Sequence, residues 1–240
     1  MLGMTFEENV EEFIHTLQGF TKMDNVFNPW QDYDKAHDLD NESPEKRREN
    51  LSKYIKERKD AKYILIAEAP GYQGCHFSGI PMTSERLILQ DKYGLGKIGL
   101  NLQRTSKTNL INMPKIVQKF GFCEPTATMV WNQIVDEIGI DSKDFVLWNA
   151  FPFHPYKYEN NMLTNRKPKK EEIVKTKSIL SLFLELFDKK QKIICIGNVS
   201  KNTLENILEL DFKLDKVRHP ANGGKKDFIK EIQALISLHT

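Results

Sequence analysis

The sequence predicts an α/β fold, a three-layer α/β/α domain with a short central parallel sheet of about four strands. Three observations predict it. Four short apolar runs, at residues 62–67, 145–150, 192–196 and 213–217, have the length of buried strands. Segments with helical spacing of apolar residues separate these runs, which is typical of a parallel sheet covered by helices on both faces. Polar segments punctuated by Pro and Gly follow three of the four runs.

Size and composition indicate a globular protein. The chain has 240 residues, of which 40% are hydrophobic and 28% are charged, and its formal net charge is +2. A chain of this length suits one domain. We interpret residues 1–240 as a single α/β/α domain with an N-terminal helical extension over about residues 1–60. Because the net charge is close to zero, any nucleic-acid-binding surface is expected to be a local patch.

No segment predicts export, membrane insertion or a metal centre. The N-terminus lacks the apolar core of a signal peptide, and no apolar stretch approaches the roughly 18 residues that span a bilayer. We therefore expect a cytoplasmic protein. Cys75, Cys123 and Cys195 are far apart and form no Cys-x-x-Cys pair, so we expect no zinc, no iron–sulfur cluster and no other cofactor.

The N-terminal part of the chain predicts two helices. Thr5 and Glu8 form a capping-box pattern ahead of an amphipathic helix. Ser43 and Pro44 predict the start of the second helix, with Ser43 as N-cap and Pro44 at the first helical position. Residues 24–43 predict an ordered loop. We interpret the many charged side chains of the second helix as a solvent-exposed face.

Further helices are predicted between and after the strands. Gly94, Gly96 and Gly99 are too loosely spaced for a phosphate-binding loop and predict turns. A basic loop at 164–170 precedes one of the helices. The remaining predicted helices lie at 84–90, around 114–119, at 125–138, at 171–188, from about residue 200, and near 225–238.

Residues suited to chemistry follow three of the predicted strands. Glu68-Ala-Pro-Gly71 comes after the first strand, Asn149 interrupts the second apolar run, and His219 comes after the last strand. The carboxyl ends of parallel strands share one edge of a sheet, and ligands bind in the crevice there. The sequence therefore predicts that the three segments converge on one site.

Each of these residues also has an ordinary structural interpretation. A carboxylate such as Glu68 can cap a turn, and Asn149 can bond to neighbouring backbone. As a functional group, the Asn149 amide offers one donor and one acceptor to a planar ligand. His219 precedes Pro220 and four small residues, so its loop can approach a ligand closely. We place His154, which is flanked by prolines, on a rigid surface turn.

Taken together, these motifs resemble those of the uracil-DNA glycosylase superfamily. Ala67-Glu-Ala-Pro-Gly71, Ser78-Gly-Ile-Pro-Met82, Asn149 and Arg218-His-Pro220 occur in the family's order over roughly residues 60–235. The first motif is most similar to the Glu-Ala-Pro-Gly form of the bacterial and archaeal thermostable branch. The resemblance implies a three-layer α/β/α fold and a monofunctional enzyme of base-excision repair. Such an enzyme hydrolyses the N-glycosidic bond of uracil or a related deaminated base after flipping it out of DNA.

The resemblance also implies a role for each matching residue. The loop of Glu68, Ala69, Pro70 and Gly71 would hold the hydrolytic water. Asn149 would read the edge of the pyrimidine, and His219 would donate to the departing base. Met82 stands where relatives carry an aromatic residue that stacks on the base, so Phe77 or another ring is expected to stack instead. Basic and polar residues near the last motif are expected to contact DNA or to be plain surface groups: Lys213, Lys216, Arg218, Asn222, Lys225 and Lys226.

Departures from the family pattern leave alternatives open. The iron–sulfur cysteines of the thermostable branch are absent, and Met82 replaces an aromatic residue. Family members differ in which motif position bears the catalytic carboxylate, so Glu68 is a candidate base. The alternative function is a non-catalytic, nucleic-acid- or base-binding member of the superfamily. A small-molecule α/β enzyme is disfavoured because no Gly-x-Gly-x-x-Gly or P-loop pattern occurs. We expect a monomer whose partner is DNA containing a damaged base, with no membrane partner.

Overall fold

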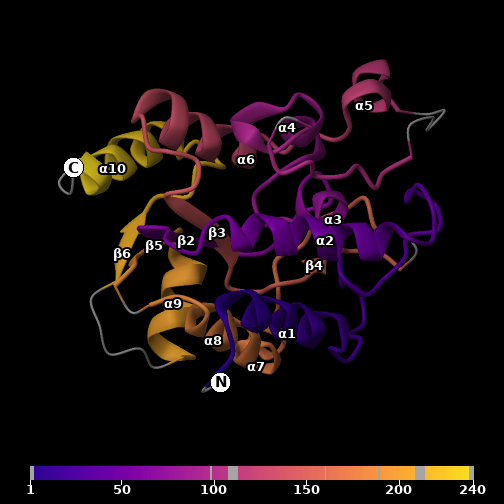
Figure 1. The fold of residues 1–240 in the computed structure, drawn as a ribbon, viewed down its shortest axis with the longest axis horizontal. Helices are drawn as coiled ribbons and strands as arrows, with labels where there is room; N and C mark the ends of the chain where they lie inside the picture. Colours follow the sequence, from indigo (N-terminus) through magenta and orange to yellow (C-terminus); the bar gives the residue numbers. More distant parts are fainter. Residues whose placement is uncertain are drawn as a thin grey trace.

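The computed structural model describes residues 3–97, 99–107, 113–159, 161–188, 190–208 and 214–237. At its centre lies a four-stranded parallel sheet with the strand order β3-β2-β5-β6 (Figure 1). The strands are β2 (Tyr63–Ala67), β3 (Phe145–Asn149), β5 (Lys192–Ile196) and β6 (Asp215–Val217). The predicted α/β fold with a four-stranded parallel sheet is therefore confirmed. Lys213, the predicted start of the last strand, lies outside the described residues.

The two apolar runs nearest the site form strands that are buried on both faces. All five residues of β2 and all five residues of β3 are buried. Buried runs of this kind are typical of parallel sheets, because helices cover both faces. The register places Asn149 opposite Ala67. The segments that follow β2 and β3 therefore begin side by side at the same edge of the sheet.

Helices cover both faces of the sheet (Figure 1). On one face, Phe13 and Phe183 contact Trp148 of β3. Their ring centroids lie 5.3 Å (Phe13) and 4.4 Å (Phe183) from the centroid of the Trp148 ring. On the other face, Trp131 contacts Phe145 at 5.0 Å. The first face carries α1 (Phe6–Gln18), α7 (Lys170–Lys175), α8 (Lys177–Glu185) and α9 (Asn198–Asn206), and the second carries α6 (Pro125–Trp131) and α10 (Lys225–Ser237).

The predicted helices are present, with shifted boundaries. Thr5 and Glu8 form the expected capping box of α1. Helix α2 (Ser43–Lys56) begins at Ser43, so this residue is helical and is not the N-cap. The helix predicted at 171–188 is divided into α7 and α8 at Thr176, whose hydroxyl donates back to the carbonyl of Ile173. The short elements are α3 (Cys75–Ser78), α4 (Glu85–Leu89), a 3₁₀ turn (Lys92–Gly94), α5 (Lys115–Phe120) and a π-helix (Asn132–Glu137) that continues α6.

Among the described helices, none combines the length and the apolar character that crossing a membrane requires. The interpretation of the charged side chains of the second helix as a solvent-exposed face is wrong for Arg47 of α2 and for Arg58, which follows the helix. Arg47 is fully buried and its Nη1 lies 2.7 Å from a carboxylate oxygen of Asp38. Arg58 is also buried and bonds the carbonyl of Tyr54. The Tyr54 hydroxyl accepts from the N–H of Leu147 at 2.9 Å, so α2 covers the open edge of β3.

A small antiparallel ribbon lies where the sequence predicted a loop and a surface turn. Strands β1 (Val26–Phe27) and β4 (His154–Pro155) pair with each other. The placement of His154 on the surface is wrong, because this side chain is fully buried. Its Nδ1 lies 2.9 Å from Nδ1 of His76, and the His76 ring stacks on Phe27 at 3.9 Å. The ribbon therefore carries a buried pair of histidines.

Candidate active site

The carboxyl edge of the sheet carries all three predicted site segments. Glu68 follows β2, Asn149 ends β3 and His219 lies just beyond β6. The backbone N–H of Phe151 donates to the carbonyl of Glu68 at 3.0 Å, which continues the pairing of the two segments beyond the strands. Glu68 and Asn149 thus lie at the ends of two adjacent strands, β2 and β3. His219 follows β6, which is separated from β2 by β5 along the same edge of the sheet.

Asn149 has a buried side-chain amide that the protein leaves unbonded. The residue is 1% exposed, and neither its Oδ1 nor its Nδ2 has a hydrogen-bond partner among the described residues. The ordinary interpretation, an amide bonded to neighbouring backbone, is therefore not what the structure contains. A buried polar group without a partner costs roughly 1–3 kcal/mol. An amide kept in this state is suited to a ligand that supplies one acceptor and one donor.

Glu68 has a half-buried carboxylate at the start of the motif loop. Burial raises the pKa of this carboxyl group, and the positive charge of Lys167 acts in the opposite direction. Pro70 is buried, and Ala69 and Gly71 are partly buried. Lys167 belongs to the basic loop at 164–170, to which the sequence assigned no role. The positive charge that acts on Glu68 therefore comes from a loop outside the predicted motifs.

His219 is partly buried and has a defined tautomer. Its Nδ1 accepts a hydrogen bond from the N–H of Ala221 at 3.1 Å. Since Nδ1 uses its lone pair there, the neutral ring carries its proton on Nε2. Burial lowers the pKa of His219, and the charge of Arg218 lowers it further. The site therefore holds a neutral imidazole whose Nε2–H is the donor.

Two glycines allow backbone to pack closely against His219. A Cβ at Gly197, where φ is +91°, would lie 3.3 Å from the Cβ of His219. A Cβ at Gly224 would lie 2.1 Å from the carbonyl oxygen of His219, so no other residue fits there without a shift of the loop. The adjoining hollow of about 160 Å³ is lined by Gly197, Asn198, Lys216, Val217, Arg218, His219 and Glu231.

Both residues considered for stacking on a base are buried. Phe77 has no exposed surface, and its ring stacks on Phe122 with centroids 4.7 Å apart and planes at 5°. Met82 is 4% exposed and adopts a φ of +48°. Tyr72, which sequence reasoning did not single out, is partly buried and contacts Phe122 edge-on at 5.9 Å. Tyr72 is therefore the more accessible ring beside the motif loop.

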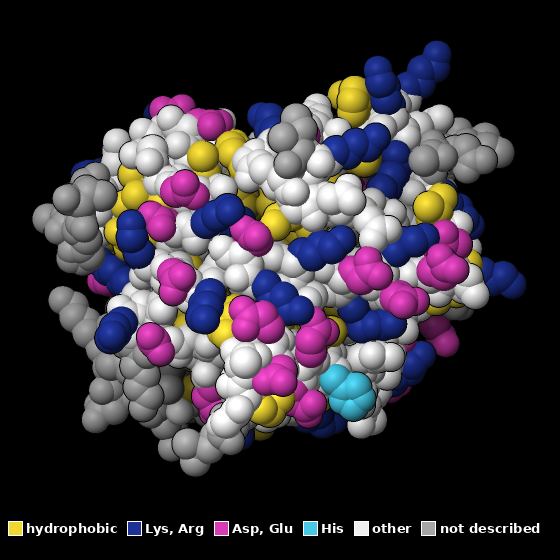
Figure 2. Space-filling view, viewed as in Figure 1, with side chains coloured by type: hydrophobic (Ala, Val, Ile, Leu, Met, Phe, Trp, Pro, Cys, Tyr) yellow, Lys and Arg dark blue, Asp and Glu magenta, His cyan; other side chains and the backbone are white. Residues whose placement is uncertain are grey.

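The residues expected to contact DNA lie on the surface. Arg218, Asn222 and Lys225 are all exposed, and Asn222 has a φ of +53° in the loop after the last motif. Figure 2 shows lysine and arginine side chains interspersed with acidic ones over the viewed face. This distribution agrees with the low net charge. A phosphate-binding surface would therefore be formed by local groups of basic residues.

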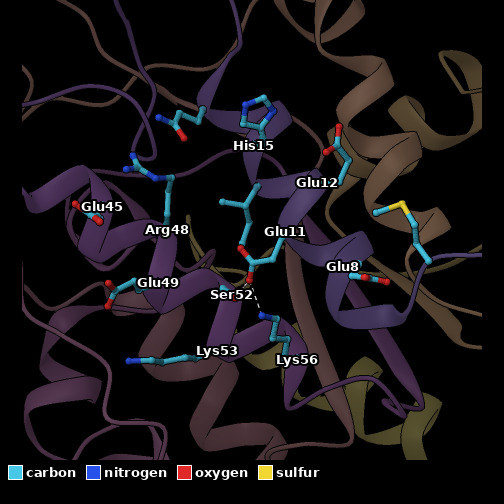
Figure 3. A pocket seen from close by; sticks show the side chains of 13 residues that line it. Glu8, Glu11, Glu12, His15, Glu45, Arg48, Glu49, Ser52, Lys53 and Lys56 are labelled. Carbon is cyan, nitrogen blue, oxygen red and sulfur yellow. Dashed lines mark hydrogen bonds and ion pairs between the residues drawn. The ribbon is translucent and has the colours of Figure 1, made fainter. Parts of the chain in front are cut away.

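A larger hollow lies elsewhere. A groove of about 830 Å³ runs between α1 and α2 and is lined by acidic and basic side chains (Figure 3). Within it, Lys56 bonds a carboxylate oxygen of Glu11. None of the predicted site residues lines this groove. The groove is thus separate from the carboxyl edge of the sheet.

Comparisons with known proteins agree with this fold. The structure of wild-type SMUG2 from Pedobacter heparinus is similar to the chain, with a TM-score of 0.63, 15% sequence identity and 98% of each chain covered. At this identity the likeness establishes the fold. A comparison with curated proteins gives no match. A family model described as the uracil DNA glycosylase superfamily matches residues 54–240, which is more than half of the sequence. The chain therefore belongs to the uracil DNA glycosylase superfamily.

Proposed function

We propose that the protein is a monofunctional DNA glycosylase that hydrolyses the N-glycosidic bond of uracil, or of a related deaminated base, in DNA. Such a reaction opens base-excision repair. The observation that carries the proposal is the buried Asn149 amide, which has no hydrogen-bond partner among the described residues. It lies at the strand edge where α/β proteins bind ligands. Membership of the superfamily supports DNA as the substrate.

Asn149 would recognise a base that presents an acceptor next to a ring N–H. Its Nδ2 would donate to O4 of uracil, and its Oδ1 would accept from N3–H. Hypoxanthine and xanthine present the same pair of groups, whereas cytosine presents the reverse pair. The described residues supply no bond that fixes the orientation of the amide. Discrimination against cytosine would therefore depend on contacts that form when the base binds.

His219 and Glu68 would act on the two fragments of the breaking bond. As the bond between N1 and C1′ breaks, its electron pair goes to the base and the sugar acquires oxocarbenium character. The Nε2–H of His219 would donate to O2 of the departing base, where negative charge develops. Glu68 would hold a water molecule in position and stabilise the cationic sugar. Attack of that water on C1′, with transfer of its proton to the carboxylate of Glu68, would complete the hydrolysis without a covalent intermediate.

The base must leave the duplex before this chemistry takes place. Flipping a base out of the stack costs a few kcal/mol. Exposed Arg218, Asn222 and Lys225 would contribute by binding phosphates beside the last motif. These contacts set the position of the strand and carry little sequence information. We propose that a monomer is the active form.

Labelled oligonucleotides that contain one uracil, hypoxanthine or xanthine test the proposal. They are incubated with excess protein, as single strands and as duplexes, and the abasic sites are then cleaved with alkali. We expect cleavage at the modified base with the natural chain and its loss with Asn149→Ala. Binding of the oligonucleotides without cleavage of any of them would instead support the non-catalytic alternative.

A further inference from the structure

One end of the motif loop is held by a side chain that is distant in the sequence. The backbone N–H of Tyr72 donates to Oδ1 of Asn165 at 3.1 Å. A Cβ added at Gly71 would lie 3.4 Å from both Oδ1 and Nδ2 of Asn165, so the amide lies directly against the Gly71 backbone. Asn165 belongs to the same basic loop as Lys167. It therefore connects this loop to the segment that begins at Glu68.

A buried imidazole orients the Asn165 amide. Nε2 of His154 lies 3.0 Å from Oδ1 of Asn165 and 2.8 Å from the carbonyl oxygen of Thr164. Because both oxygens are acceptors, Nε2 of His154 carries a proton. Oδ1 of Asn165 thus accepts from two donors, the Tyr72 N–H and the His154 Nε2–H. The His154 ring is itself fixed, because it is fully buried and its Nδ1 meets Nδ1 of His76 at 2.9 Å.

The residues on either side of Asn165 are also fixed. Arg166 makes two bonds to the carboxylate of Glu172, at 2.7 and 2.8 Å, a paired geometry that restricts direction as well as distance. The hydroxyl of Thr164 accepts from the N–H of Lys157 at 3.0 Å. Asn165 is exposed at the surface, yet it is held between two anchored neighbours. Its contact with Gly71 and Tyr72 is therefore part of a rigid arrangement.

We propose that Asn165 is a positioning residue that holds the Gly71–Tyr72 peptide, and with it the Glu68 segment, in the geometry that orients the hydrolytic water. This inference rests on the glycosylase function proposed above. Asn165 bonds backbone and His154, so it acts through the motif loop. Displacing a reacting group by about 1 Å can lower a rate on the order of 100-fold. Loss of the Asn165 contact should therefore slow the chemical step more than it weakens DNA binding.

Two substitutions test whether the acceptor oxygen of Asn165 holds the loop. Asn165→Ala removes both bonds, whereas Asn165→Asp keeps an acceptor oxygen for Tyr72 and His154. We expect Asn165→Ala to lower the single-turnover rate of uracil excision by about 10- to 100-fold and to change DNA affinity by less than about threefold. Asn165→Asp should recover the rate to within about threefold of the natural chain. Asn161→Ala is the matched control, since Asn161 is also exposed, lies just before the basic loop and bonds through its backbone.

Hydrogen exchange of the Tyr72 amide, followed by NMR on the full chain, provides a readout that is independent of catalysis. Exchange should be faster in Asn165→Ala and close to that of the natural chain in Asn165→Asp and Asn161→Ala. If the natural chain excises no base, the proposed function fails, and Tyr72 exchange alone decides whether Asn165 holds the loop. If the natural chain is active, an unchanged rate in Asn165→Ala would overturn the positioning role. Unchanged protection of Tyr72 in Asn165→Ala would overturn it as well.

Discussion

Asn149 lies directly opposite Ala67 in the parallel pairing of β3 with β2. Because Glu68 follows Ala67, a buried amide and a half-buried carboxylate begin at neighbouring positions of one sheet edge. Neither group has the environment that a purely structural polar residue usually has. The amide lacks a hydrogen-bond partner among the described residues, and burial raises the pKa of the carboxyl group. Buried groups with a shifted pKa or an unmet hydrogen-bonding capacity concentrate at functional sites.

Replacing His219 should slow the chemistry and spare DNA binding. His219→Ala removes the Nε2–H donor, and loss of one such donor lowers a rate by roughly 10²–10³. Affinity for DNA should change much less, because phosphate contacts supply most of the binding. Single-turnover excision and a binding titration on the same uracil oligonucleotide measure the two effects. His15→Ala, an exposed histidine on α1, is the control and should match the natural chain.

Replacing Asn149 by leucine should abolish excision without loss of stability. The substitution removes a buried amide that has no partner among the described residues, and such removal leaves the free energy of unfolding unchanged or raises it by about 1 kcal/mol. Chemical denaturation gives the stability, and the oligonucleotide assay gives the activity. A loss of several kcal/mol would indicate that the amide has a structural role.

Asn149→Asp tests the direction of base reading. The substitution replaces the Nδ2 donor with an acceptor that would face O4 of uracil, so excision should fall at least about 100-fold. The free base uracil should also bind more weakly to this variant than to the natural chain. Equal excision by the two proteins would show that Asn149 does not read the base.

The pH profile of excision should depend on Lys167. Burial raises the pKa of Glu68, so its carboxylate is protonated, and excision lost, at a higher pH than the ordinary value of 4.5 would give. Lys167 opposes this shift, so Lys167→Gln should raise the pKa of Glu68 further and move the acidic limb to higher pH. Lys169→Gln, an exposed lysine of the same loop, is the control. The difference between the two variants should shrink in high salt. An identical acidic limb in the two variants would show that Lys167 does not influence the group that titrates.

Excision should persist in EDTA. Cys75, Cys123 and Cys195 have no spacing that closes a metal site, and the proposed chemistry uses an imidazole, a carboxylate and an amide. Elemental analysis of active protein is the complementary measurement. Stoichiometric iron or zinc, together with loss of activity on its removal, would contradict the prediction.

The sequence by itself determined the elements whose signals are local. The apolar runs of β2 and β3 predicted buried strands, Thr5 and Glu8 predicted the capping box of α1, and the position of Asn149 at a strand end predicted its place on the sheet edge. Each of these signals depends on a few consecutive residues. Parallel-sheet geometry then places the strand ends at one edge without further information.

Only the tertiary structure decided which side chains are enclosed by distant parts of the chain. The prolines that flank His154 predict a surface turn, yet pairing of β4 with β1 and contact with His76 bury this side chain. The sequence predicts Phe77 as a ring that stacks on the base, yet Phe77 stacks on the distant Phe122 and is fully buried. The hydrogen bond between the Tyr72 N–H and Oδ1 of Asn165 also joins distant parts of the chain. Such contacts join residues that are far apart in sequence, and burial depends on everything that packs around a residue, so no local pattern encodes them.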